Sequence, residues 1–260
     1  MTTVTYALQD SATMLRRNVR HMARYPSMTV LLVGMPVVLL LLFVYVFGGT
    51  LGAGLGGGRD AYLEFVTPGI MLITIASAAQ GTAISVATDM IEGIIARFRT
   101  MAISRSSVLT GHVVGSLIQT MVALAVVTGV AVLVGFRPTA DALEWLAAIG
   151  LLAGFTFALT WLSVALGLVS RSVETASNLP MFLMLLPFLG SGFVPTDSMP
   201  TGLRWFAEYQ PFSPVIETLR GLLLGGPIGN NGVLAVAWTV AIALFGYVWA
   251  KRLYEHRAIR

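Results

Sequence analysis

Hydrophobic residues dominate six long windows of this chain that contain no Asp, Glu, Lys or Arg. A helix needs roughly 20 apolar residues to cross the core of a bilayer, and a charge at its centre costs about 2.5–3.5 kcal/mol. The pattern therefore predicts an all-α membrane protein with six transmembrane helices. The expected spans are about 28–47, 65–87, 110–134, 146–169, 175–194 and 233–250.

Prolines and glycines modify this pattern at defined places. Pro36 should kink the first span, and Pro180 and Pro187 should kink the fifth. We expect the glycine-rich stretches at 48–58 and 225–232 to form loops beside their spans.

Lysine and arginine are distributed unevenly between the two sides of the predicted spans. Twelve of them fall on the side of both termini, and four fall on the other side. Because cytoplasmic segments are enriched in Lys and Arg, both termini are expected to be cytoplasmic. The chain, 1–260, then forms a single transmembrane domain with a cytoplasmic tail at 251–260. Its many arginines and single lysine indicate a GC-rich bacterial genome, and hence a bacterial plasma membrane.

Two cytoplasmic segments have amphipathic patterns. In residues 1–26, apolar positions recur at helical spacing between four arginines, which predicts a helix lying on the membrane surface. A charged flank with no other role is the alternative. The segment 89–108 also places apolar residues, such as Ile91 and Phe98, on one helical face. It is either a surface helix or a helix that docks into a groove of a cytoplasmic partner, and periodicity does not decide.

The last external loop, 195–232, contains a half-apolar segment that is too short and too charged to span the bilayer. Pro211 and Pro214 suit the start of a helix, and the later Gly-Gly-Pro suits its end. Glu217 and Arg220 are three residues apart and can pair on one helical face. We expect a re-entrant helical region that caps a pathway, since irregular backbone at membrane depth requires surrounding protein or a cavity. A simple external lid is the alternative.

Composition excludes several classes of protein. Hydrophobic residues make up 56% of the chain and charged residues 11%, whereas about 25% of residues are charged in ordinary globular domains. This excludes disorder, a nucleic-acid domain and a water-soluble enzyme. There is no cysteine, the three histidines are far apart, and no phosphate-binding loop or zinc-protease motif occurs. The chain is therefore expected to be no enzyme and to bind no metal, cofactor or nucleic acid.

The middles of the predicted spans carry neutral polar residues and no ionisable ones, which argues against an ion-coupled carrier. Such residues can hydrogen-bond neighbouring helices, or they can line a path for a weakly polar cargo. The candidate cargo path comprises Ser77, Gln80, Gln119, Asn178 and Phe182.

Two stretches before the last span are distinctive. They read Ser191-Gly-Phe-Val-Pro-Thr-Asp-Ser-Met-Pro and Pro211-Phe-Ser-Pro-Val-Ile-Glu-Thr-Leu-Arg-Gly-Leu-Leu-Leu-Gly. Together with the loop that runs from Asp89 to Ser104-Arg105, they resemble the type-2 permeases of ABC exporters. The length and sequence style look most like the daunorubicin-resistance-type drug efflux permeases, and the resemblance covers nearly the whole chain.

The resemblance implies that two permease chains, identical or related, assemble in membrane lipid with two separate ATPase chains that bind ATP and Mg. It implies export of an amphiphilic drug or lipid-like substrate. A polysaccharide or glycolipid exporter permease and a non-transporting assembly subunit are the alternatives. The residues expected to couple the permease to the ATPase are Asp89, Glu92, Gly93, Arg97, Arg99 and Arg105. The residues expected at the external gate are Pro195, Pro211, Pro214, Glu217 and Arg220.

Overall fold

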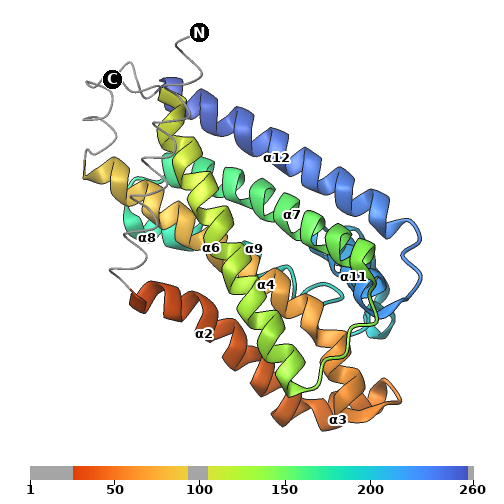
Figure 1. Ribbon diagram of the computed structural model, residues 1–260. Coiled ribbons are helices and arrows are strands. Elements are labelled where there is room, and N and C mark those ends of the chain that lie inside the picture. Colours follow the sequence, from red (N-terminus) through yellow and green to blue (C-terminus); the bar gives the residue numbers. More distant parts are fainter. Residues whose placement is uncertain (1–25, 93–104, 257–260) are drawn as a thin grey trace.

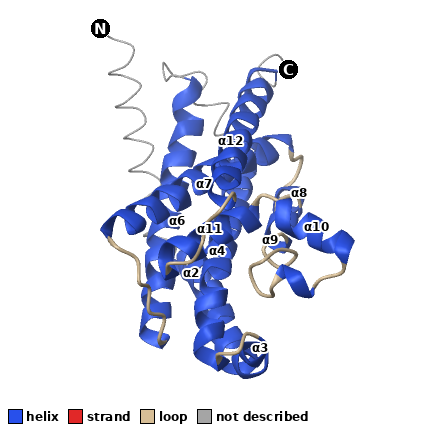
Figure 2. Ribbon diagram, turned by 90° about the vertical axis from the view of Figure 1, so that its right-hand side faces the viewer, coloured by secondary structure: helices blue, strands red, loops and turns tan. Residues whose placement is uncertain are grey.

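A computed structural model describes residues 26–92 and 105–256, and every regular element in this part of the chain is a helix (Figures 1 and 2). The elements are α2 (Pro26–Leu42), the π-helix η1 (Phe43–Phe47), α3 (Gly48–Gly54), α4 (Gly58–Ile91), α6 (Arg105–Val134), α7 (Ala142–Val169), α8 (Val173–Asn178), α9 (Met181–Leu185), the 3-10 helix η2 (Thr196–Ser198), α10 (Thr201–Tyr209), α11 (Phe212–Leu224) and α12 (Asn231–His256). The predicted N-terminal surface helix lies outside the described residues.

Five helical stretches in the described ranges are long and apolar enough to cross a membrane, one fewer than the sequence predicted. They are Leu32–Gly54, Gly58–Ile91, Thr110–Val134, Ala142–Val169 and Asn231–Tyr254. The predicted fifth span, 175–194, is not one continuous helix: α8 and α9 are separated at Pro180, and turns follow from Leu186. Proline lacks the amide hydrogen that a helix needs and crowds the preceding turn, so Pro180 and Pro187 break this segment where kinks were expected.

Three other boundaries differ from the prediction. The stretch from Gly48 to Gly54 is helical and continues α2 through η1, so it is not a loop. Helix α7 begins earlier than expected because Asp141 and Glu144 form reciprocal capping hydrogen bonds, of 2.7 and 2.8 Å. Helix α12 runs to His256, so the first residues of the predicted tail continue the last helix.

Helix α4 is the centre of the fold. It packs against α2, α3, α6, α7, α8 and α11, whereas α12 packs mainly on α7 and α11 (Figure 1). In its most apolar window, 72% of α4 is buried, against 17% of α12. The exposed apolar side chains of α12 and of α2 therefore form the outer surface, as expected of helices that face lipid.

Glycines bring helices of this bundle into close contact. A Cβ atom on Gly167 of α7 would lie 2.6 Å from the carbonyl oxygen of Ala83 in α4, and one on Gly246 of α12 would lie 2.6 Å from the amide nitrogen of Leu162 in α7. Small residues at such positions allow membrane helices to approach until their backbones touch. The layers α4, α7 and α12 are packed in this way.

The bundle has two ends. The α3 end, as we call it, holds α3 and the loop 135–141, where the Thr139 amide donates to the Leu223 carbonyl at 2.9 Å. At the α8 end, Val86, Val113, Leu168 and Tyr254 meet in one apolar cluster. Of the basic residues in the described part, Arg59 and Arg137 lie at the α3 end, and Arg171, Lys251 and Arg252 lie at the α8 end. The others are Arg105 at the start of α6, Arg204 in α10 and Arg220 in α11.

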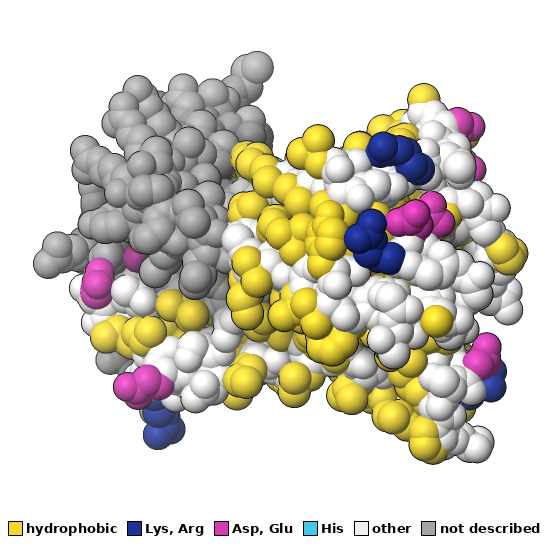
Figure 3. Space-filling model, turned by 90° about the horizontal axis from the view of Figure 1, so that it is seen from below, with side chains coloured by type: hydrophobic (Ala, Val, Ile, Leu, Met, Phe, Trp, Pro, Cys, Tyr) yellow, Lys and Arg dark blue, Asp and Glu magenta, His cyan; other side chains and the backbone are white. Residues whose placement is uncertain are grey.

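One face of the molecule shows a broad area of hydrophobic side chains, while the acidic and basic side chains gather in a few groups (Figure 3). Large apolar residues on the surface include Leu133, Leu143 and Val233, which are 87%, 72% and 74% exposed. Soluble monomers seldom expose apolar patches larger than a few hundred Å². This surface is suited to contact with hydrocarbon.

Candidate functional site

Helix α11 forms where the sequence predicted a helix in the external loop. Pro211 is its N-cap, where the missing amide hydrogen costs nothing, and Pro214 lies in its first turn. It ends at Gly225, whose φ of 74° is the left-handed conformation that terminates helices. Most of α11 is buried against α4, α7 and α12.

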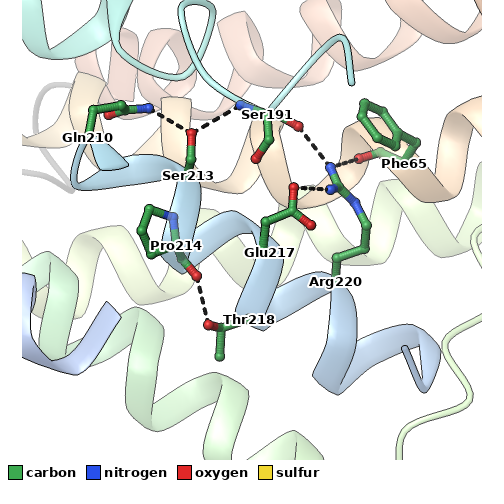
Figure 4. A network of polar contacts seen from close by, with 8 residues as sticks. All are labelled: Phe65, Ser191, Gln210, Ser213, Pro214, Glu217, Thr218 and Arg220. Carbon is green, nitrogen blue, oxygen red and sulfur yellow. Dashed lines mark hydrogen bonds and ion pairs between the residues drawn. The ribbon is translucent and has the colours of Figure 1, made fainter. Parts of the chain in front are cut away.

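Arg220 of α11 binds three groups at once (Figure 4). Its Nη1 donates to Glu217 Oε1 at 2.6 Å, which confirms the predicted pair. Its Nη2 donates to the carbonyl oxygens of Phe65 in α4, at 3.0 Å, and of Ser191, at 2.9 Å. The guanidinium also lies 3.9 Å from the centre of the Phe65 ring. One side chain therefore joins α11, α4 and the segment after α9.

Ser213 and Gln210 support this contact from the start of α11. The Ser213 hydroxyl oxygen accepts from the Ser191 amide at 3.1 Å and from Gln210 Nε2 at 3.0 Å. Gln210 Nε2 also donates to the Leu186 carbonyl at 3.1 Å. From helix α4, the Tyr62 hydroxyl donates to the carbonyl of Phe193 at 3.1 Å. The irregular segment 186–193 is thus held by hydrogen bonds from two helices.

The charge of Arg220 is under two opposing influences. Burial lowers the pKa of its guanidinium from the ordinary value, while the charge of Glu217 and the hydrogen bond to it act to raise that pKa. A buried guanidinium is stable only when its donors are paired. Two backbone carbonyls and one carboxylate meet most of this requirement.

A pocket of about 780 Å³ opens beside Arg220. Of the predicted gate residues, Pro195, Glu217 and Arg220 line it, whereas Pro211 and Pro214 do not. The Pro214 carbonyl instead accepts from the Thr218 hydroxyl at 2.7 Å, which is a contact within α11. Further walls come from Glu208 and Tyr209 of α10, and from Asn230, Asn231, Val233 and Leu234 at the start of α12.

Helix α10 forms the outer wall of the pocket, and the sequence reasoning missed it. Pro200 at its N-cap and the amphipathic order of its residues are the signals that could have located it. Arg204 pairs with Asp197 and Glu208, each at 2.6 Å, and the hydrogen bond to Glu208 raises the pKa of this exposed guanidinium. Trp238 of α12 donates to the Tyr209 carbonyl at 3.0 Å and attaches α10 to α12.

Three of the six predicted coupling residues fall within the described ranges, at the end of α4 and the start of α6. Asp89, in the last turns of α4, contacts His112 of α6, with 3.1 Å between Oδ2 and Nε2, a pairing that the sequence did not suggest. Glu92 is exposed and caps the C-terminus of α4. Arg105 is the first residue of α6. The remaining members, Gly93, Arg97 and Arg99, lie outside the described residues.

The predicted cargo-path residues are only partly brought together. Gln80 of α4 donates from Nε2 to the Ser177 carbonyl at 2.7 Å, next to the exposed Asn178 at the end of α8. Phe182 of α9 is half exposed. The Ser77 hydroxyl is buried and has no hydrogen-bond partner among the described residues. Gln119 is half-buried on α6, and no hydrogen bond within the described ranges joins it to the others. In the same part of the chain, no group of three or more His, Asp or Glu could hold a metal ion.

The family described as ABC-2 type transporter matches residues 10–224. The daunorubicin resistance ABC transporter permease protein DrrB1 of Streptomyces coeruleorubidus is 29% identical over 253 residues, which cover 96% of this chain and 88% of that protein. The probable doxorubicin resistance ABC transporter permease protein DrrC of Mycobacterium tuberculosis is 27% identical over 212 residues, covering 80% and 76%. ABC transporter G family member 20 of Dictyostelium discoideum is 26% identical over 177 residues, covering 66% and 23%.

Proposed function

The chain belongs to the ABC-2 type transporter family, and from this premise we propose that it moves an amphiphilic drug or lipid-like substrate outward across the bacterial plasma membrane. It is a multi-pass permease subunit, homologous to drug-resistance exporter permeases. Such permeases lack ATPase activity, and membership implies an ATPase partner subunit. The similarity to a daunorubicin resistance permease over 96% of the chain is the observation that carries the proposed direction and cargo.

The proposed assembly has two permease chains and two ATPase chains. The second permease is either a copy of this chain or a related one. ATP and Mg bind in the ATPase, and this chain binds no cofactor. Both termini face the cytoplasm, which makes the α8 end cytoplasmic and the α3 end external. The twelve-to-four division of Lys and Arg along the sequence supports this orientation.

Helix α4 is the proposed mechanical link between the ATPase and the external gate. Asp89 near its C-terminus contacts His112, so α4 and α6 are joined where the coupling loop leaves them. Phe65 near its other end binds Arg220. These two contacts are separated by about 36 Å of helix, at a rise of 1.5 Å per residue. A push on Glu92, at the tip of α4, would therefore be transmitted to α11 along a helix that is unbroken from Gly58 to Ile91.

The broken segment from α8 to Pro195 is the proposed wall of the cargo path. It follows α4 from Gln80, which binds the Ser177 carbonyl, to Tyr62, which binds the Phe193 carbonyl. Broken helices at membrane depth are tolerated where protein or a water-filled cavity surrounds them. The proposed contacts with cargo are Ser77, Gln80, Gln119, Asn178 and Phe182.

Transport by the reconstituted complex tests this proposal. The tagged chain is purified in mild detergent with the ATPase that accompanies it, and the complex is placed in liposomes with its ATPase outside. ATP should drive accumulation of daunorubicin inside these vesicles. We expect Glu92→Lys to reduce accumulation at least tenfold while ATP hydrolysis continues, because the coupling contact is disrupted.

Asp60→Lys is the matched control, since Asp60 is exposed in the first turn of α4 at the opposite end. It should retain accumulation. Transport that a protonophore abolishes while ATP remains would indicate an ion-coupled carrier instead. Recovery of the chain without any ATPase, in several detergents, would favour a non-transporting subunit.

A further inference from the structure

Helix α10 carries large apolar side chains on its surface although it is too short to cross a membrane. Trp205 is 68% exposed, and Leu203, Phe206 and Tyr209 are 42%, 40% and 51% exposed. The rings of Trp205 and Tyr209, one helical turn apart, have centres 5.7 Å from each other. Figure 2 shows α10 at the edge of the molecule. The described part of the chain therefore leaves these four side chains only partly covered.

The charged side chains of α10 lie on the opposite side of the helix. At about 3.6 residues per turn, Leu203, Phe206 and Tyr209 follow one another at intervals of three and share one face. Arg204 and Glu208 are four residues apart on the other face, where they form an ion pair of 2.6 Å. An amphipathic helix with aromatic residues on one face and charges on the other is typical of a helix that lies on a membrane surface.

A hydrogen bond to α12 determines the depth of α10. Trp238 Nε1 of α12 donates to the Tyr209 carbonyl at 3.0 Å. Helix α12 begins at Asn231 and ends beside the apolar cluster of the α8 end, so its first residues lie at the α3 end. Trp238 is about 10 Å along the helix axis from Asn231. Surface helices bury their apolar face about 5–10 Å into the boundary between headgroups and acyl chains, which is the depth of this attachment.

The surface of α12 around this attachment faces lipid. Helix α12 is among the helices long and apolar enough to cross a membrane, and only 17% of its most apolar window is buried. Val236 and Val240, which precede and follow Trp238, are exposed. The apolar face of α10 is therefore attached to a surface that hydrocarbon covers. A water-soluble protein that bound this face would have to displace lipid.

We propose that α10 binds the lipid surface of the leaflet at the α3 end. Leu203 and Phe206 enter the hydrocarbon just below the headgroups. The rings of Trp205 and Tyr209 lie at the level of the headgroups, where the amphipathic rings of these residue types are enriched. The pair of Arg204 with Glu208 faces water. The proposal concerns attachment to lipid, and it rests neither on transport nor on the ATPase.

Nitroxide labels along α10 test this orientation. The chain contains no cysteine, so a single cysteine can be introduced and labelled at any position. The labelled full chain is placed in phosphatidylcholine nanodiscs. Collision of the label with oxygen, which concentrates in hydrocarbon, is compared with its collision with a water-soluble nickel chelate. The oxygen-to-nickel ratio at Leu203→Cys and Phe206→Cys should exceed that at Thr201→Cys and Arg204→Cys at least about threefold.

Two further labels calibrate the depth. Leu244→Cys lies on the exposed surface of α12 farther from its start, and Asp60→Cys lies in the exposed first turn of α4. The ratio at Phe206→Cys should fall between the ratios at these two positions. A ratio equal to that of Asp60→Cys would overturn the proposal. A label at Phe206→Cys that neither reagent reaches would also overturn it, because a protein, such as a second copy of this chain, would then cover the face.

A matched pair of charge substitutions tests whether the apolar face holds α10 in the lipid. Trp205→Glu places a carboxylate at the headgroup level, so the label at Leu203→Cys should move toward water and lose at least about half of its oxygen-to-nickel ratio. Thr201→Glu is the control, because it adds the same charge one turn earlier, at an exposed position on the charged side of α10. It should leave the ratio unchanged. Equal effects of the two substitutions would overturn the proposal.

Discussion

Helices α10 and α11 are neighbours in the chain, and each is built around an arginine with a carboxylate at helical spacing. Arg204 of α10 pairs with Glu208 four residues on, and Arg220 of α11 pairs with Glu217 three residues back. The Arg204 side chain is 45% exposed, and the Arg220 side chain is 17% exposed. Only Arg220 also binds carbonyls of distant segments. Nearly the same local motif is thus a surface ion pair in α10, whereas in α11 it forms a tertiary contact with Phe65 and Ser191, which we call the Arg220 joint.

The two arginines differ because Arg204 is solvated by water, whereas Arg220 is buried and depends on its protein partners. An exposed ion pair gains little, because water solvates both charges well when they are apart. A buried guanidinium loses that solvation. Removing one member of a buried ion pair leaves the other charge buried and unpaired, and this destabilises the fold far more than the intact pair stabilises it. We therefore expect substitutions around Arg220 to have large effects and substitutions around Arg204 to have small ones.

The largest effect should come from Arg220→Ala. This change leaves Glu217 half-buried without its partner and leaves the Phe65 and Ser191 carbonyls without a donor. We expect the free energy of unfolding, measured by chemical denaturation in detergent, to fall by about 3 kcal/mol. The double variant Arg220→Met with Glu217→Leu should recover most of the loss, because no isolated charge remains. A loss no larger than that of Arg204→Ala would contradict the comparison.

Gly69→Ala should have the next largest effect, because it separates the surfaces that enclose Arg220. A Cβ atom on Gly69 of α4 would lie 2.5 Å from the carbonyl oxygen of Gly192. We expect a loss of about 2 kcal/mol in the same denaturation measurement, as for other overpacked sites. Gly81→Ala is the control on the same helix, since nothing lies within 4 Å of its added Cβ. It should leave stability unchanged or raise it by up to about 1 kcal/mol.

Ser213→Ala should remove hydrogen bonds that hold the segment around Ser191 in place, while the charges of Arg220 and Glu217 stay. The Ser191 amide and Gln210 Nε2 would both lose their shared acceptor. Gln210 Nε2 would keep the Leu186 carbonyl, but the buried Ser191 amide would have no acceptor left, which predicts a loss of about 1–2 kcal/mol. The comparison with Ser191→Ala is direct, because that hydroxyl makes no bond in the described residues and its loss should change stability by less than about 0.5 kcal/mol. Equal losses in the two variants would show that the Ser213 hydroxyl is not the shared support.

The smallest effect should come from Arg204→Ala on the surface of α10. We expect its denaturation midpoint to match that of the wild type within the error of measurement. Any difference should vanish when the salt concentration is raised, since exposed pairs are screened. A large, salt-insensitive loss would mean that α10 is as firmly built into the fold as α11.

The two helices also differ in how far the sequence could predict them. Helix α11 was predicted with its start at Pro211 and its end at Gly225, because caps and prolines act locally. The Glu217–Arg220 pair was predicted for the same reason, since helical spacing alone places the two side chains together. Helix α10 is amphipathic, but it was missed because its nine residues are fewer than the roughly 11 to 18 over which a helical period is ordinarily recognised.

The broken segment shows a different limit. Apolar content placed 175–194 in the membrane, but apolar content does not determine whether a backbone is one continuous helix. The hydrogen bonds of Tyr62 and Gln80 to carbonyls of this segment join residues far apart in the chain. Backbone groups that a broken helix leaves unpaired must find such partners, and no pattern within the segment itself reveals them.

The sequence by itself determined the membrane class, the ends of α11 and the pair within it. These depend on residues a few positions apart, or on charge counted over whole segments. Only the tertiary structure decided that α4 lies at the centre, that Arg220 meets the carbonyls of Phe65 and Ser191, and that Asp89 meets His112. Those contacts join segments distant in sequence, and they arise because packing brings together groups whose burial then requires a partner.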